Sequence, residues 1–498
     1  CGAHRRRSPW AIAFPPVPIT FPAMRLRRWL LALVPALLAC DGRSARRDDT
    51  VLFASGADLQ SINPLFTVHP LAKQVQRYVL LTTLVRYDSL LRLEPYLARR
   101  WQWSVDRKEL TLTLFAGLRW HDGEPTTARD AAWTIDRARD PATGYPRESD
   151  LEGLRSVAAA DDTTLVLTFE RPVPRMPDVL TDLAILPRHQ FAGVPLSRMR
   201  EAAWHQRPVG NGPFRFVRHE ANRRWVFERN EEFPAALGGP PALARLVIAV
   251  VDEPLTKLAA LASGELDAAG IQPAHAEYVR RDPALRVVDY PLLFSTVILF
   301  NVRREVFADA ASRLAVASAL DRAALVDGAV YGFGTPADGP IPPEVPAPPP
   351  RPGAKGAPPV AEPGSLRFEL LTVGSGEAAI EQLIQSQLAR SGISIEIRQL
   401  ELSAFLDRVY GRGHEFDAAL MGVPGDLQLG QLGPLAALSG LSPPDDPGDL
   451  ARFYADSVPA TFIYHARGLQ GLSRRLTGIE LGLRGELASV TRWRLDPP

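Results

Sequence analysis

The chain has 498 residues, 46% of them apolar, and a chain of this length exceeds what one hydrophobic core usually supports, so we expect at least two lobes. Its formal net charge of +1 is unevenly distributed, because six Arg and no acidic residues precede residue 40, which leaves 51 Lys and Arg against 56 Asp and Glu, a net charge of −5. No basic surface then remains to neutralise phosphates, which argues against nucleic acid as a partner.

The N-terminal region has the pattern of a secretory signal peptide over 24–39. Met24 begins a basic segment, an apolar run follows over 29–39, and the small residue Ala39 ends it. The apolar run is too short to span a bilayer as a stable helix. Residues 1–23 precede this start, and we interpret them as upstream sequence that is not native to the protein.

The residue after this segment is Cys40, and 37–40 reads Leu-Leu-Ala-Cys. This resembles a bacterial lipobox, in which the cysteine is lipidated and becomes the mature N-terminus. The resemblance implies a lipid on Cys40 and a short tether over 40–50 that holds the protein at a membrane. The alternative is cleavage nearby, with Cys40 left as an unmodified thiol. Since Cys40 would be the sole cysteine of the mature chain, we expect no internal disulfide.

A strand, a turn and a capped helix are predicted in succession in the first half of the chain. Residues 109–114 alternate between Leu and polar residues, as a strand with one buried face requires. Gly123 marks a turn after it. Thr127 stands three residues before Asp130, the spacing at which two side chains cap a helix start. A helix is therefore expected to begin near Ala128.

Short sequence blocks follow one another along the chain in a fixed order. They are LVRYD (84–88), EPYLA (94–98), LRWHDG (118–123), PVGNGPF (208–214), SGELD (263–267) and GFGTPADGP (332–340). In this order they resemble the solute-binding proteins of peptide and nickel ABC importers, family 5. The resemblance implies an α/β fold with two periplasmic-binding-protein-like lobes (type II, large peptide-binding class) and an extra subdomain in lobe one.

The same blocks imply how the chain divides between the lobes. Two chain crossings would form the hinge between them, and no reacting group is needed, because the lobes close over a solute. Residues 336–363 hold twelve prolines, so we expect an extended surface loop where the family has a short helix. The expected divisions are 50–287 for lobe one with its subdomain at about 93–204, 288–462 for lobe two, and 463–498 for the return to lobe one.

Lobe two is predicted to contain a parallel strand, helix and strand unit over 366–373, 377–390 and 393–400. A further strand is expected over 415–422. After it, the family has a longer substrate-lining stretch, whereas this chain has a short run over 425–459 that is rich in Gly, Pro and Leu.

Asp426 is the first candidate ligand-binding residue. In dipeptide-binding members of the family, an Asp soon after this strand compensates the α-ammonium of the peptide, and Asp426 is the matching position. A hydrogen bond to a charged group contributes about 1.5 to 3 kcal/mol. The alternative is that Asp426 is a solvated loop residue.

Four aromatic residues are further candidates for ligand contact. Tyr331 directly precedes the 332–340 block and Phe333 lies in it, beside the expected cleft, so the resemblance places them near the ligand. Trp101 and Trp103 alternate with polar neighbours, which favours packing in the core over stacking on a ligand.

Catalytic and metal chemistry find little support in the residue spacing. The nine His residues form no HxxxH and there is no CxxC, so we expect no metal or cofactor, and a structural role for His121. Residues 208–214 lack the spacing of a phosphate-binding loop. Ser375 follows a strand and precedes a helix, as a hydrolase nucleophile would, but it fits a helix N-cap equally well.

The sequence thus predicts an exported, lipid-anchored solute-binding protein on the outer side of the cytoplasmic membrane, and not an enzyme. The resemblance implies an oligopeptide or another small solute as ligand, and a membrane permease and an ATPase as partners of a monomer. A second hypothesis is an extracytoplasmic sensor or scaffold that kept the fold and lost import. A third, less favoured, is a hydrolase that uses Ser375.

Overall fold

The fold was analysed in a computed structural model, which describes residues 49–337, 339–346, 366–374, 379–427, 429–444 and 447–497. Among these residues, no helix combines the length and the apolar composition needed to cross a bilayer. Several predicted features lie outside the described residues, namely 1–23, the signal peptide 24–39, Cys40 with most of its tether, Ser375 and the larger part of the proline-rich segment.

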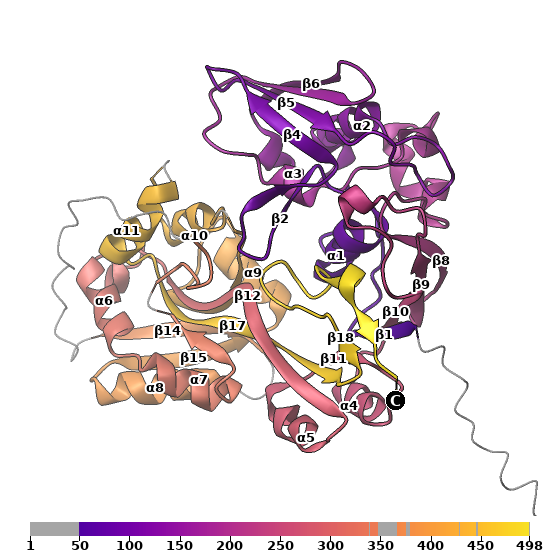
Figure 1. Cartoon of the computed structure of the whole chain (residues 1–498). Helices are drawn as coiled ribbons and strands as arrows, with labels where there is room; N and C mark the ends of the chain where they lie inside the picture. The colour runs from indigo at the N-terminus through magenta and orange to yellow at the C-terminus, as the bar shows by residue number, and fades with distance from the viewer. Residues whose placement is uncertain are drawn as a thin grey trace, which may run out of the picture. The chain divides into compact units, whose positions relative to one another are not determined.

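One large mixed sheet runs through both lobes (Figure 1). Its order is β15 (Ser394–Leu400), β14 (Arg367–Val373), β16 (Ala418–Pro424), β12 (Leu285–Phe300), β17 (Ala460–Ser473), β11 (Ala268–Gly270), β1 (Thr50–Ser55), β10 (Arg245–Val250), β9 (Arg224–Arg229) and β8 (Phe214–Glu220), and β13 (Gly334–Pro336) also pairs with β17.

The helices of the described residues are distributed over both lobes. They are α1 (Pro70–Val75), continued by a π-helix over Gln76–Leu80, α2 (Ala128–Ala138), α3 (Val179–Asp182), α4 (Pro254–Ala262), α5 (Ala276–Arg281), α6 (Ala310–Ser318), α7 (Arg322–Val330), α8 (Ala379–Arg390), α9 (Leu402–Tyr410), α10 (Leu432–Ser439) and α11 (Pro447–Ser457).

Two long antiparallel strands, β12 and β17, join the lobes. Residues Leu285–Pro291 of β12 pair with the end of β17, which in turn pairs with β11 of lobe one. Beyond a register shift between Pro291 and Ser295, β12 continues to Phe300 and pairs on its other edge with β16 of lobe two. A bulge of this kind bends a strand locally. These two strands lie where the sequence places the two chain crossings, and the exact division between the lobes stays a prediction.

Lobe two packs helices against both faces of its strands, because successive β12 side chains point to opposite sides. Ile298 and Phe300 lie in a core shared with α6, α7 and α8. Val297 and Leu299 lie in a second core shared with α9, α10 and α11. The predicted parallel unit is confirmed, because β14 and β15 pair in parallel along their whole length on either side of α8.

Two features of lobe two differ from what the sequence suggested. The run over 425–459, for which no helix was predicted, contains the helices α10 and α11. Gly and Pro residues in this run interrupt the apolar periodicity from which helices are predicted. Ala337 and Val345, at the start of the predicted surface loop, are buried in the lobe-two core.

Lobe one is built on β1, which pairs in parallel with β10 over six residues. Phe53 of β1 faces the main core, where Trp493 from the end of the chain stacks on it at a ring-centroid distance of 6.0 Å. Leu52 and Ala54 face the other side of the sheet. Two small sheets accompany this part of the chain, β2 (Val85–Tyr87) with β3 (Leu93–Pro95) and β18 (Leu476–Thr477) with β19 (Arg494–Leu495).

A separate four-stranded antiparallel sheet corresponds in position to the predicted subdomain. The predicted strand over 109–114 is β5, and the predicted helix is α2, which begins at Ala128. The Asp130 carboxylate accepts a hydrogen bond from the Thr127 backbone N–H at 2.8 Å, which confirms the capping box. The order of this sheet is β4 (Ala98–Trp103), β5 (Glu109–Leu114), β7 (Thr164–Phe169) and β6 (Leu154–Ala159).

Candidate ligand-binding site

Asp426 lies in the turn between β16 and α10. Its carboxylate accepts a hydrogen bond from the Gly430 N–H at 3.1 Å, and its own N–H donates to the side-chain oxygen of Gln431 at 3.3 Å. The turn therefore fixes the position of the Asp426 carboxylate on lobe two.

The Asp426 carboxylate acts electrostatically on Asp150 of lobe one. Burial raises the pKa of Asp150, and the negative charges of Asp178 and Asp426 raise it further, whereas Arg147 lowers it. The net result is a raised pKa, so the site disfavours the charge on Asp150. We call Asp150 and Asp426 the acidic pair, since a carboxylate from each lobe contributes to one negative field.

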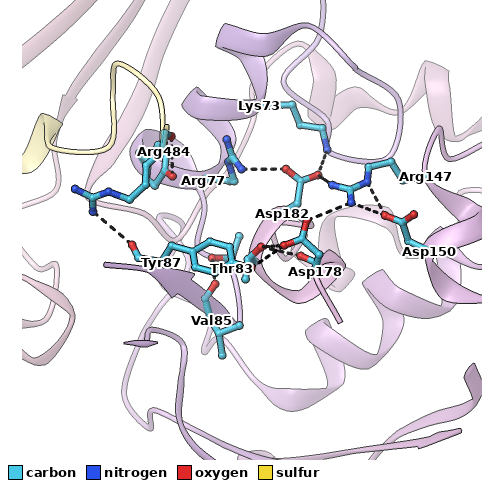
Figure 2. A network of polar contacts seen from close by, with 12 residues as sticks. Lys73, Arg77, Thr83, Val85, Tyr87, Arg147, Asp150, Asp178, Asp182 and Arg484 are labelled. Carbon is cyan, nitrogen blue, oxygen red and sulfur yellow. Dashed lines mark hydrogen bonds and ion pairs between the residues drawn. The ribbon is translucent and has the colours of Figure 1, made fainter. Parts of the chain in front are cut away.

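Asp150 is the outer member of a network of charges in lobe one (Figure 2). Arg147 occupies its centre and contacts Asp150 at 2.5 Å, Asp178 at 3.3 Å and Asp182 at 3.3 Å. The Tyr87 hydroxyl donates a hydrogen bond to Asp178 at 3.0 Å. Through Arg147, these contacts fix the position of the Asp150 side chain in lobe one.

The inner end of the network is Asp182, at the end of α3. Its carboxylate receives Lys73 at 2.7 Å and Arg77 at 3.1 Å, both from the helix that begins with α1. Burial would raise the pKa of Asp182, but the charges of Lys73, Arg77 and Arg147 outweigh burial and hold the pKa well below its ordinary range. Three cations thus face three carboxylates, and we call these six residues the ion network (Lys73, Arg77, Arg147, Asp150, Asp178 and Asp182).

A cavity of about 490 Å³ lies where the C-terminal loop meets the turn between β2 and β3. Arg484 of that loop donates a hydrogen bond to the backbone oxygen of Tyr87 at 3.4 Å, which ties the loop to β2 (Figure 2). Pro291 of β12 and Glu344 of lobe two also line the cavity. Residues from both lobes therefore meet at this cavity.

A model of the bacterial extracellular solute-binding proteins, family 5, middle region, matches residues 92–432. The chain belongs to this family. Among solved structures, the oligopeptide-binding protein AppA of Bacillus subtilis in complex with a nonapeptide has a TM-score of 0.70 and 20% identity, over 90% of this chain and 99% of that chain. At that identity the similarity shows the fold, which is the two-lobed fold predicted from the sequence.

The family 5 protein spans about half the length of the first curated relatives that it matches. A Brucella ovis protein named provisionally as an ABC transporter peptide-binding protein is 31% identical over 257 residues, which cover 51% of this chain and 48% of that protein. Di/tripeptide-binding protein 4 of Pseudomonas aeruginosa is 28% identical over 370 residues, 67% of this chain and 68% of that protein.

The other two predicted ligand-binding residues lie on other elements, at the end of α7 and just before β13. Tyr331 ends α7 in a left-handed conformation with φ of 54°, and 65% of it is exposed. The Phe333 ring lies 5.4 Å from the guanidinium of Arg280 on α5. Their contact with a ligand stays a prediction.

Residues predicted to be structural do pack as expected. The Trp103 ring lies 5.8 Å from that of Phe169, and both Trp101 and Trp103 pack on the lobe-one core. His121 accepts a hydrogen bond at Nδ1 from the Gly210 N–H, and its Nε2 donates to Gly212 O at 3.0 Å. Burial lowers the pKa of His121 to about 4. The described residues contain no His, Cys, Asp or Glu cluster that could hold a metal ion.

The ion network was not predicted from the sequence. One signal was present: Lys73 and Arg77 are four residues apart, and so are Asp178 and Asp182. Residues at this spacing share one face of a helix, so each pair could have been expected to act together. Nothing in the sequence, however, indicated that the two faces meet, or that Arg147 lies between them.

Proposed function

We propose that this family 5 protein is the binding component of an ABC importer and that its solute is a small peptide or a similar solute with a free ammonium group. The observation that carries the proposal is the position of Asp426, which Gly430 and Gln431 hold in the turn after β16, and from which its charge adds to the raised pKa of Asp150. An ammonium group near both carboxylates would offset this effect. The names of the Brucella and Pseudomonas relatives support a peptide as the solute.

Electrostatics also supply a reason for the lobes to close. Bringing Asp426 towards lobe one without a ligand increases the repulsion with Asp150, whereas a bound ammonium reverses the sign of that interaction. A charge-assisted hydrogen bond contributes about 1.5 to 3 kcal/mol. The ligand therefore favours the closed state over the open state, which is the requirement for a ligand-driven transition.

The decisive experiment compares free and N-acetylated di- and tripeptides by isothermal titration calorimetry, after native mass spectrometry has identified any solute retained by the purified protein. We expect N-acetylation to weaken binding at least about tenfold, and Asp426→Asn to weaken binding of the free peptides to a similar extent. Asp407→Asn, an exposed change on α9 of the same lobe, is the matched control. Equal affinity of free and acetylated peptides would refute the proposed role of the acidic pair.

The proposal includes a location and partners. A signal peptide over 24–39 and a lipid on Cys40 would hold the protein at the outer side of the cytoplasmic membrane as a monomer, where a permease and an ATPase receive the solute. We expect Cys40→Ser to release the protein from membranes without changing its ligand affinity. Fractionation of cells that express each form measures this, and continued membrane attachment of the Ser variant would exclude the lipid anchor.

A further inference from the structure

We propose that lobe one carries a second ligand site, a pocket that binds a small oxyanion such as a carboxylate or a phosphate group. The pocket has a volume of about 520 Å³, within the range of about 300 to 1,000 Å³ typical of small-molecule sites. Three separate segments of lobe one supply its walls: the loop from Gln60 to His69, the segment that holds Arg200 and His205, and the β8–β9 hairpin with His219 and Trp225. We call it the histidine pocket.

Arg200 supplies the positive charge of the histidine pocket. Its guanidinium lies 4.2 Å from the centroid of the Phe66 ring. Among the described residues, no carboxylate or carbonyl is recorded as a hydrogen-bond or ion-pair partner of Arg200. Its neighbour Arg198 differs, because it pairs with Glu201 at 2.9 Å. The planar set of donors on Arg200 therefore remains available, and that geometry suits the paired oxygens of a carboxylate or a phosphate.

His69 adds a neutral donor to the same pocket. Its Nδ1 accepts a hydrogen bond from the backbone N–H of Ala72 at 3.3 Å, so the ring proton is on Nε2, which is then free to donate. Burial lowers the pKa of His69, against the effect of Asp58, and so favours the neutral ring, whose tautomer the Ala72 N–H sets. The Thr67 hydroxyl oxygen accepts from the His69 N–H at 3.2 Å, which leaves its own proton to donate.

Asp58 lies beside the pocket, but its oxygens are already engaged. They accept hydrogen bonds from Trp225 Nε1 at 2.7 Å, the Asn222 N–H at 2.7 Å and His219 Nε2 at 2.9 Å. Burial raises the pKa of Asp58, but these hydrogen bonds outweigh it and bring the pKa to about 2. Asp58 therefore acts on the walls of the pocket, where it holds His219 stacked on Trp225 at 3.8 Å.

The combination favours an anion over a cation or a neutral ligand. Asp58 is ionised, but its oxygens already accept three hydrogen bonds. In the part of the chain that the structure describes, by contrast, no acceptor is found for the donors of Arg200, for the His69 Nε2 proton or for the Thr67 hydroxyl proton. The Phe66 ring supplies an apolar wall, so a small carboxylic acid or a phosphate monoester with an apolar body fits the lining. The site lies within lobe one and does not depend on the proposed peptide function or on closure of the lobes.

The test uses the full chain and two probes, inorganic phosphate and succinate, each titrated separately by calorimetry and by NMR of ¹⁵N-labelled imidazoles. We expect saturable binding of at least one probe, with changes in the ¹⁵N chemical shifts of His69 and His205. The probe that binds more tightly identifies the preferred class of oxyanion, phosphate or carboxylate. Arg200→Gln should weaken it at least about tenfold, and Arg200→Lys by less, because Lys keeps the charge without the planar donors.

Matched controls separate this site from the acidic pair. Arg198→Gln removes an exposed arginine from the same segment and should leave the titration unchanged, as should Asp426→Asn. Thermal unfolding of each variant verifies that it is folded. If neither probe binds saturably, or if Arg200→Gln binds as the unmodified protein does, the oxyanion site is refuted, whatever the outcome for peptides.

Discussion

The ion network and the acidic pair both contain aspartates, but the pKa of Asp182 is lowered and that of Asp150 is raised. Asp182 is surrounded by Lys73, Arg77 and Arg147, and its pKa is lowered. Asp150 shares Arg147, but burial raises its pKa more than Arg147 lowers it, and the charges of Asp178 and Asp426 add to the increase. Compensated charge at Asp182 holds the segments of lobe one together, whereas we propose that the negative charge of the acidic pair interacts with a ligand. Burial acts on both carboxyls in the same direction, so the difference lies in the number of cations that oppose it, three at Asp182 and one at Asp150.

The largest expected effect on the free energy of unfolding comes from removing the charge of Asp182 from the ion network. Asp182→Asn would leave three partly buried cations facing an amide, and removal of one partner from a buried ion pair costs about 3 to 5 kcal/mol. We expect a loss of that size in the free energy of unfolding, measured by urea denaturation. Asp136→Asn is the matched control, since Asp136 pairs with Arg139 at the surface, where such pairs contribute about 0 to 1 kcal/mol.

The pH dependence of the unfolding free energy also distinguishes Asp182 from Asp150. Because the folded-state pKa of Asp182 is depressed, its stabilising effect is complete above the ordinary carboxyl pKa of about 3.9 and is lost as the pH falls below it. Asp150 contributes to the pH dependence of stability with the opposite sign. Its pKa is raised, so its charged form destabilises the folded state and its protonation stabilises it. We expect Asp182→Asn to flatten the decline of the unfolding free energy below about pH 4. A decline as steep as in the unmodified protein would show that other carboxylates cause it.

Local patterns predicted much of the fold, because they act over a few residues. The alternation over 109–114, the Thr127 and Asp130 spacing and the β14, α8, β15 unit all appear where the sequence placed them. Helices α10 and α11 were missed, because tertiary contacts with β12 and β17 stabilise them more than their own composition does.

The candidate site was predicted only in part. Asp426 was proposed through a motif, and its ligand contact stays a prediction. Asp150, on which its charge acts, lies 276 positions earlier in the chain, and no local pattern connects the two. Tyr331 and Phe333 were predicted to lie near the ligand because they are next to or within the 332–340 block. In the structure, Phe333 lies beside Arg280 of α5. Pairings over such separations depend on how the lobes fold, which spacing rules do not encode.

The last prediction concerns the support of the helix that carries Lys73 and Arg77. Glycines in 208–214 were expected from the sequence to serve a tight backbone path, and a Cβ on Gly210 would lie 2.0 Å from the backbone oxygen of Leu80. Leu80 ends the π-helix that continues α1. Because this close contact is with backbone, Gly210→Ala must displace the helix or the loop, and overpacking of this kind costs about 1 to 3 kcal/mol.

Gly482→Ala is the matched control, since a Cβ there meets nothing within 4 Å, and substitutions at such open positions usually stay within about 0.5 kcal/mol. Combining Gly210→Ala with Asp182→Asn then tests whether the close contact positions the cations. If it does, the two losses in unfolding free energy should fall short of additive, because both changes disturb the same helix. Strict additivity would mean that the glycine contact and the ion network stabilise lobe one independently.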